Sequence, residues 1–173
     1  LDGVRVLALE QMQALPYATQ LLGRLGADVV KVEPPRGGDS GRSSQPAITD
    51  PDGRSVGATF LRNNFNKRSV TIDIKHPAGR DLVLRLAPRF DVFAENFKAG
   101  ALHRMGLGYE AVASAHPRVI YLSVSGFGNS GSAYSEWPAY ASVAEAMSGI
   151  YEFKRETGRP PVVSPVGGLA DIA

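Results

Sequence analysis

A strand, a helix and a second strand follow one another at the start of the chain, and this unit limits the folds open to it. The unit begins with an apolar run of strand length, residues 4–9, and ends with another, residues 28–33. Between the two runs, apolar side chains recur at the spacing of one helix face: Ala18, Leu21, Leu22 and Leu25. Two strands joined by one helix nearly always lie parallel with a right-handed crossover. The sequence therefore predicts an open parallel sheet, whose ligands bind beyond the carboxyl ends of its strands.

The turn between the first strand and the helix contains no glycine. It reads Glu-Gln-Met-Gln-Ala-Leu-Pro over residues 10–16. A dinucleotide site of the Rossmann type has glycines at this turn, because the backbone must approach a pyrophosphate closely. We therefore expect a Rossmann-like sheet that does not bind NAD in the usual way.

Strand-like and helix-like segments continue to alternate along the chain. Further strands are predicted at residues 69–74, 91–95 and 119–124, and helices at 77–86, 101–105, 109–115 and 140–147. This alternation is typical of an α/β fold: an open, mostly parallel sheet with helices on both faces, here without the dinucleotide glycine fingerprint. The polar stretch of residues 34–66 is longer than most loops, so a functional loop and a flexible insert are equal alternatives there.

The amino-acid composition is typical of one globular domain, and it argues against nucleic acid and membranes as partners. The chain has 173 residues, of which 43% are hydrophobic and 21% charged, with a net charge of +2 and no cysteine. Without cysteine there is no disulfide, thiolate metal ligand or thiol nucleophile. The charge is too small to indicate a nucleic-acid partner, and no apolar run approaches the roughly 20 residues of a membrane span. We expect a cytoplasmic protein that binds a small anionic molecule and no membrane.

Cationic and polar side chains gather near the predicted strand ends. Lys67 and Arg68 precede one strand and Lys75 follows it, and such cations hold phosphates through charge-assisted hydrogen bonds. A solvated basic surface is the more common alternative. Asn96 and Phe97 follow another strand, where an amide and an aromatic ring suit a flat base. A helix cap followed by a core aromatic explains the same two residues.

Near the end of the chain, Asp171 follows a run of small residues. A carboxylate held at a pocket edge can attack an acyl group and form a covalent intermediate. An aspartate that caps a helix is the commoner alternative, and spacing leaves both open. The histidines, residues 76, 103 and 116, lack the spacing of metal ligands. We therefore predict no metal site.

Several motifs occur together in an order that resembles one known family, the class III CoA-transferases, which include formyl-CoA transferase and carnitine CoA-transferase. The resemblance extends over essentially the whole chain. It is carried by Leu1-Asp2-Gly3-Val4-Arg5-Val6-Leu7, residues 18–22 and 25–33, Gly38-Asp39, Asn66-Lys67-Arg68-Ser69, Asp73-Ile74-Lys75, Glu95-Asn96-Phe97, residues 100–107 and residues 123–128.

The resemblance implies an acyl-CoA:carboxylate CoA-transferase in which Asp171 is the catalytic aspartate. In that chemistry the carboxylate attacks the donor thioester to give a mixed anhydride, and the released CoA thiolate then leaves an aspartyl-CoA thioester. The family often has an arginine directly after the glutamate of the second strand, whereas this chain has two prolines there, so Arg36 or Arg42 is the candidate for that role. The implied contacts with coenzyme A are Gln13, Ala14, Arg36, Ile72, Asp73, Ile74, Lys75, Asn96, Phe97, Lys98 and Arg104.

The resemblance also implies that residues 1–173 are the N-terminal, CoA-binding, Rossmann-like part of the large domain of a longer protein. The small domain and the C-terminal return to the large domain would then lie outside this sequence. Relatives form interlocked homodimers, and their glycine-rich loop belongs to the second half of the chain. We therefore expect the isolated segment to be inactive.

Two alternatives remain open. A 2-methylacyl-CoA racemase of the same superfamily uses a histidine and an aspartate, but the corresponding position here is Tyr140. Tyrosine is a poor base near neutral pH, because its unperturbed pKa is about 10. A non-catalytic CoA or nucleotide-binding module is the second alternative, and it requires no role for Asp171.

Overall fold

The computed structural model, which describes residues 1–129, 131–153, 155–163 and 170, is built on a five-stranded sheet. The strand order is β5-β2-β1-β6-β7 and every pairing in this sheet is parallel. The order reverses between β1 and β6, which is where open α/β sheets bind ligands. The predicted parallel α/β sheet is thus confirmed. Its strands are β1 (Arg5–Leu9), β2 (Asp28–Glu33), β5 (Lys67–Thr71), β6 (Val92–Glu95) and β7 (Ile120–Ser123).

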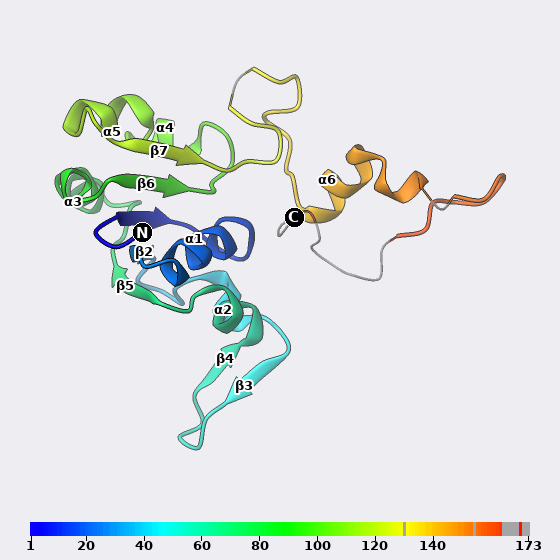
Figure 1. Ribbon diagram of the computed structural model, residues 1–173, viewed down its shortest axis with the longest axis horizontal. Coiled ribbons are helices and arrows are strands. Elements are labelled where there is room, and N and C mark those ends of the chain that lie inside the picture. The colour runs from blue at the N-terminus through cyan, green and yellow to red at the C-terminus, as the bar shows by residue number, and fades with distance from the viewer. Residues whose placement is uncertain (130, 154, 164–169, 171–173) are drawn as a thin grey trace.

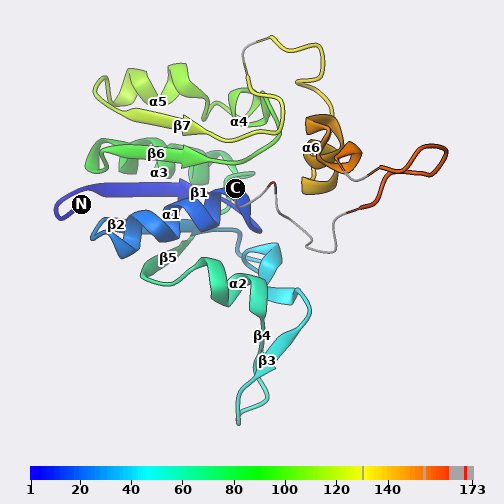
Figure 2. The same ribbon diagram turned by 45° about the vertical axis from the view of Figure 1, so that its right-hand side comes forward.

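Helices cover both faces of the sheet, as predicted, but unequally. Successive residues of β1 point to opposite faces, so Leu7 and Leu9 join one core and Val6 and Ala8 another. The first core also contains residues of α3 (Pro77–Leu86), α4 (Ala101–Arg104) and α5 (Tyr109–Ala115), whereas α1 (Ala14–Arg24) covers the second. Figures 1 and 2 show α1 on the near side of the sheet.

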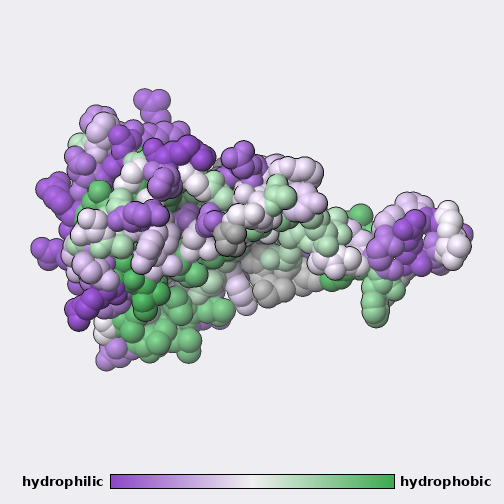
Figure 3. All heavy atoms as spheres, turned by 90° about the horizontal axis from the view of Figure 1, so that it is seen from above, coloured by the Kyte–Doolittle hydropathy of each residue, from purple (hydrophilic) through white to green (hydrophobic). Residues whose placement is uncertain are grey.

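The α1 face of the sheet is left open at its β7 edge. In β7, Tyr121 points to the first core and stacks on Phe93, with 5.2 Å between ring centroids. The alternate residues Ile120 and Leu122 remain 63% and 37% exposed. Seen from above, the body of the molecule carries an apolar area along one side (Figure 3).

The stretch of residues 34–66 is more structured than a loop. It contains a 3-10 turn (Ser40–Ser43), an antiparallel hairpin of β3 (Ala47–Thr49) and β4 (Ser55–Gly57), and the helix α2 (Ala58–Asn63). The hairpin projects from the body (Figures 1 and 2). Neither alternative of the sequence analysis describes this stretch fully, because its strands and helix are too short to give a periodic apolar signal.

Strand β5 begins and ends earlier than predicted. It pairs with β2 over residues 67–71, so residues 72–75 lie beyond its carboxyl end and lead into α3. Gly79 makes this geometry possible, because a Cβ there would lie 1.9 Å from the carbonyl oxygen of Asp73. The early end of β5 therefore places residues 72–75 at the ligand-binding edge of the sheet.

After β7 the chain leaves the sheet. The helix α6 (Ala141–Ser148) confirms the helix predicted there. Together with residues 149–153 and 155–163 it extends away from the sheet (Figure 1). Several large apolar side chains in this region are exposed, among them Tyr140 at 75% and Phe153 at 88%. A short 3-10 turn, Ile150–Glu152, follows α6; another, Ala87–Arg89, lies earlier in the chain, between α3 and β6. No helix within the described residues is both long enough and apolar enough to cross a membrane.

Candidate functional site

A cleft of about 400 Å³ opens at the carboxyl ends of β1, β2, β5 and β6. One wall is apolar and includes Val32, Ile72, Ile74, Phe97 and Met105. The cleft also has cations at its rim, because Lys75 and Arg36 line it and are exposed. No ion pair of these two side chains occurs within the described part of the chain. An apolar wall with unpaired cations suits an anionic ligand that has a flat, hydrophobic part.

The glycine-free turn between β1 and α1 forms another side of this cleft, to which it contributes Gln11. Met12 has a left-handed backbone conformation, with φ 66°. The side chain of Asn96 bridges the backbone of Gln11: its Oδ1 accepts from the Gln11 N–H at 2.9 Å and its Nδ2 donates to the Gln11 carbonyl at 2.9 Å. The turn is therefore built by remote side chains in place of glycines.

A buried ionic cluster, made of Glu10, Lys31, Asp39 and Lys67, lies behind the turn. The side chains of all four are at most 2% exposed. Lys31 Nζ lies 2.5 Å from Asp39 Oδ2 and 3.5 Å from Glu10 Oε1, which also accepts from Lys67 Nζ at 2.7 Å. Burial lowers the pKa of Lys67 to about 8, although Glu10 opposes the shift. The cluster holds two positive and two negative charges, so buried charge is balanced locally.

The sequence reasoning did not identify this cluster. One signal was available: Lys31 stands within the apolar run Val29-Val30-Lys31-Val32, in a strand whose neighbours are buried. A lysine in such a strand needs an internal anion. Its partners, however, come from the end of β1 and from a loop residue, and sequence spacing does not reveal them.

Glu33, at the end of β2, joins the same edge. It accepts from Arg42 Nε and Nη2, both at 2.7 Å, from Ser69 Oγ at 2.6 Å and from the Asp39 N–H at 2.8 Å. Burial alone would raise the pKa of Glu33, but these hydrogen bonds lower it to about 2. Arg42 also stacks over the Phe60 ring, 3.7 Å from its centroid. Of the two candidate arginines, Arg42 is thus tied to the protein, and Arg36 faces the cleft.

The carboxyl ends of β6 and β7 are joined by a hydrogen bond from Ser123 Oγ to Glu95. Glu95 also accepts from the Phe97 N–H at 2.8 Å. Burial raises the pKa of Glu95 above its usual value, and these two hydrogen bonds oppose the shift. This arrangement fixes the backbone from which Phe97 projects into the cleft.

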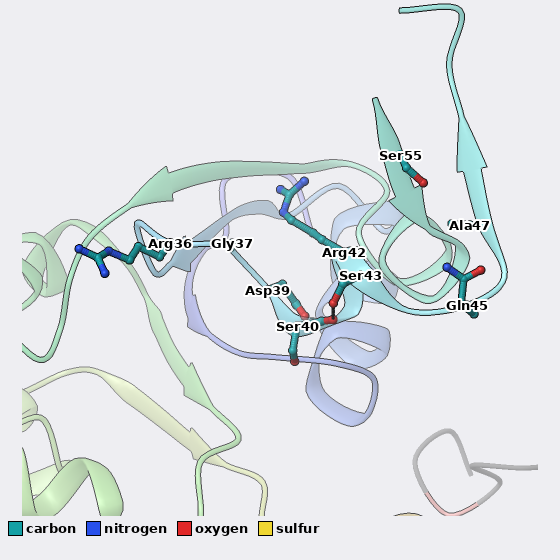
Figure 4. Close-up of a pocket in the computed structure, with 10 residues that line it drawn as sticks. Arg36, Gly37, Asp39, Ser40, Arg42, Ser43, Gln45, Ala47 and Ser55 are labelled. Carbon is teal, nitrogen blue, oxygen red and sulfur yellow. Dashed lines mark hydrogen bonds between the residues drawn. The ribbon is translucent and has the colours of Figure 1, made fainter. Parts of the chain in front are cut away.

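A second, more open cavity of about 590 Å³ adjoins the cleft and shares Arg36 with it. Its lining is polar and comes from the loop after β2 and from the hairpin. Figure 4 shows Asp39, Ser40 and Ser43 close together, while the side chain of Arg36 points away from them. The loop after β2 thus separates two cavities.

Six of the residues predicted to contact coenzyme A line the cleft together: Arg36, Ile72, Asp73, Ile74, Lys75 and Phe97. The other predicted contacts lie outside its lining. Asn96 binds the Gln11 backbone, and Gln13 Oε1 accepts from Arg62 Nη2 at 2.8 Å. Ala14 is the first residue of α1, while Lys98 and Arg104 are exposed. Asp171, the predicted catalytic residue, lies outside the described residues.

The cationic motif at residues 67–68 is not a phosphate site. Lys67 belongs to the buried ionic cluster, and Arg68 pairs with Asp28, with Nη2 2.6 Å from Oδ2. Both cations are therefore already paired. The alternative of a solvated basic surface describes the exposed Arg68 but is wrong for Lys67, whose side chain is buried. Within the described residues, no three His, Cys, Asp or Glu side chains are grouped closely enough to hold a metal ion.

Comparison with known proteins places the chain in a family. The model of "CoA-transferase family III" matches residues 1–173. A succinate–glutarate CoA-transferase of Agrobacterium fabrum is 39% identical over 99% of this chain and 43% of its own length. A formyl-CoA:oxalate CoA-transferase of Streptomyces avermitilis is 40% identical over 95% of this chain and 38% of its own.

A solved structure agrees with these matches. The crystal structure of a CAIB/BAIF family protein from Brucella suis superimposes with a TM-score of 0.89 at 41% identity, over 99% of this chain and 44% of that one. The chain therefore spans less than half the length of the relatives it matches. A family match over every residue, together with this likeness in fold and sequence, shows that the chain belongs to CoA-transferase family III.

Proposed function

We propose that this chain is the N-terminal, CoA-binding part of an acyl-CoA:carboxylate CoA-transferase, and that Asp171 carries the reaction. The cleft at the switch point of the sheet is the observation that supports this most. It combines an apolar wall with the cations Lys75 and Arg36, which form no ion pair with any residue that the structure describes. Coenzyme A has both features that such a cleft suits: a flat base and several phosphates. The matched relatives are named as CoA-transferases.

The proposed reaction passes through two covalent states of Asp171. Its carboxylate oxygen attacks the carbonyl carbon of the donor acyl-CoA, the C–S bond breaks, and CoA leaves as a thiolate from a mixed anhydride. The thiolate attacks the aspartyl carbonyl, which releases the donor acid as a carboxylate and leaves an aspartyl-CoA thioester. The acceptor carboxylate reverses these two steps, so that it takes the CoA and Asp171 is restored.

In this proposal the described residues bind and orient the CoA. Phe97 and the Ile72–Ile74 wall receive the base, and the cations of Lys75 and Arg36 meet phosphate oxygens. The remaining part of a longer chain, assembled as a homodimer, supplies the rest of the acyl site. We accordingly expect the isolated 173 residues to bind CoA without transferring it.

Trapping the covalent state in the full-length protein tests the mechanism. After incubation with succinyl-CoA alone, mass spectrometry of peptides should find CoA attached to Asp171. Asp171→Ala should lose both the adduct and turnover while it keeps CoA binding, whereas Asp52→Asn, at an exposed turn where the side chain is 74% exposed, should behave as wild type. Turnover without any adduct, or turnover by Asp171→Ala, would refute the aspartyl mechanism.

A further inference from the structure

Four consecutive backbone polar groups of the β1–α1 turn are bound by side chains from distant parts of the chain. Asn96 binds the N–H and the carbonyl of Gln11. Asp39 Oδ1 accepts from the Met12 N–H at 3.0 Å, and Asn63 Nδ2 donates to the Met12 carbonyl at 3.3 Å. These side chains come from the end of β6, the loop after β2 and the end of α2. The turn therefore depends on all three segments for its shape.

The backbone of Met12 requires such support. A positive φ at a non-glycine residue costs about 1–2 kcal/mol, and φ at Met12 is 66°. The Met12 side chain does not offset this cost by burial, because the residue is 44% exposed. The hydrogen bonds to the Met12 and Gln11 backbone are thus what holds the turn in this conformation.

Among these side chains, that of Asp39 makes hydrogen bonds to the largest number of groups. Its Oδ1 binds the N–H groups of Met12 and Gly41, and its Oδ2 binds Lys31 Nζ at 2.5 Å. Its own N–H donates to Glu33 at 2.8 Å. The side chain is 0% exposed. Asp39 therefore joins the turn to the end of β2 and to the loop that follows it.

We infer that Asp39 is a positioning residue for the coenzyme A site: it fixes the β1–α1 turn, and with it Gln11, against the cleft wall that follows β2. The inference rests on the proposed function, under which the cleft that the turn lines through Gln11 binds coenzyme A. Asp39 acts through Met12 and Gly41, which need an oxygen acceptor, and through Lys31, which needs a negative charge. These two demands can be separated by mutation.

The test compares two substitutions in the full-length protein by calorimetric titration with CoA. Asp39→Asn keeps an oxygen that can accept from both N–H groups, so the Kd for CoA should stay within about threefold of wild type. Asp39→Ala removes the acceptor and should raise the Kd about tenfold, the effect of one or two lost hydrogen bonds to the turn. Both variants should melt at a lower temperature, because each removes the nearer anion of Lys31 and leaves Glu10, at 3.5 Å.

A matched control lies in the hairpin. Asp50 makes the same kind of contacts, with Oδ1 on the N–H groups of Asp52 and Arg54 and Oδ2 on Arg54 Nε, but on an exposed turn away from the cleft. Asp50→Ala should leave the Kd for CoA unchanged. If Asp39→Ala does not fold, Asn63→Ala decides: it releases the Met12 carbonyl without disturbing a charge, and it should also weaken CoA binding several-fold.

Two results would overturn the inference. One is an Asp39→Ala or Asn63→Ala variant that binds CoA as wild type does. The other is an equal loss of affinity in Asp39→Asn and Asp39→Ala that follows their loss of thermal stability, because Asp39 would then matter only through its charge. Failure of the proposed function looks different: the wild-type protein itself would not bind CoA, and both proposals would fall together.

Discussion

One wall of the cleft, residues 72–75, rests against a glycine in the first turn of α3. A Cβ at residue 79 would lie 1.9 Å from the Asp73 carbonyl oxygen, whereas Cβ contacts under 3.0 Å are essentially never found. In a Gly79→Ala variant the helix and the wall must therefore separate until this distance reaches at least 3.0 Å. Overpacking of this kind costs about 1–3 kcal/mol, and the better helix propensity of alanine returns up to about 1 kcal/mol. We expect a net loss of about 1–2 kcal/mol in the free energy of unfolding.

The same displacement moves the cleft wall that carries Ile74 and Lys75, so binding should suffer as well as stability. Urea unfolding followed by circular dichroism measures the first effect, and calorimetric titration with CoA the second. A displacement of about 1 Å at a binding wall is expected to weaken CoA binding about tenfold or more.

Gly23→Ala is the matched control, because Gly23 also lies within a helix but its nearest neighbour, the Asn66 carbonyl oxygen, would be 3.3 Å from the new Cβ. Its stability should change by less than about 1 kcal/mol, and its CoA affinity should not change. If Gly79→Ala were as stable as Gly23→Ala and bound CoA equally well, the close approach of α3 would not shape the cleft.

Three further predictions concern charge and surface. Burial would raise the pKa of Glu33, but hydrogen bonds lower it in the folded state to about 2, from its ordinary value of 4.5. Glu33 therefore stabilises the fold above about pH 4.5 and loses this contribution, up to about 3 kcal/mol, as the pH falls toward 2. Glu33→Gln should therefore lower the melting temperature at pH 7 and the difference from wild type should shrink at pH 3; a constant difference would refute this. Lys75→Ala should raise the Kd for CoA about tenfold at low salt and less at high salt, because salt screens an exposed cation; equal losses in both titrations would argue against a phosphate contact. In the isolated 173-residue chain, Ile120→Thr with Leu122→Thr should reduce aggregation measured by light scattering without lowering the melting temperature by more than a few degrees; unchanged aggregation would show that this surface is not responsible.

The sheet could be predicted from the sequence because its central strands are long apolar runs separated by helix-like segments. Most of the cleft wall was predicted too, through the resemblance of residues 72–75 and Phe97 to a family motif. Composition and spacing alone favoured a solvated surface for Lys75 and a core aromatic for Phe97, because a motif shows residue types and not the directions in which side chains point.

The buried polar groups were harder to predict. The sequence suggests Lys67 as a phosphate ligand, and only the fold shows that Glu10, 57 positions earlier, accepts a hydrogen bond from its Nζ at 2.7 Å. Asn96 reads as a ligand contact, yet its amide binds the backbone of Gln11 across 85 positions. Interactions over such sequence separations leave no periodic trace. The hairpin of β3 and β4 was not predicted for a different reason. Strands of three residues are too short to show an alternation of polar and apolar side chains.

Because the chain leaves the sheet after β7, the CoA cleft and residue 171 are joined by an exposed segment. Cleavage of that segment by a protease can therefore test CoA binding and turnover separately. Residues 155–163 are exposed throughout and include Arg155, a site for trypsin; the bond after Arg159 precedes Pro160 and resists this protease. A nick there in the folded, full-length enzyme cuts the covalent path between the CoA cleft and residue 171. Under the proposed mechanism, the nicked protein should still bind CoA as long as the sheet stays folded. Its turnover should fall if the new chain end that carries residue 171 moves away from the cleft.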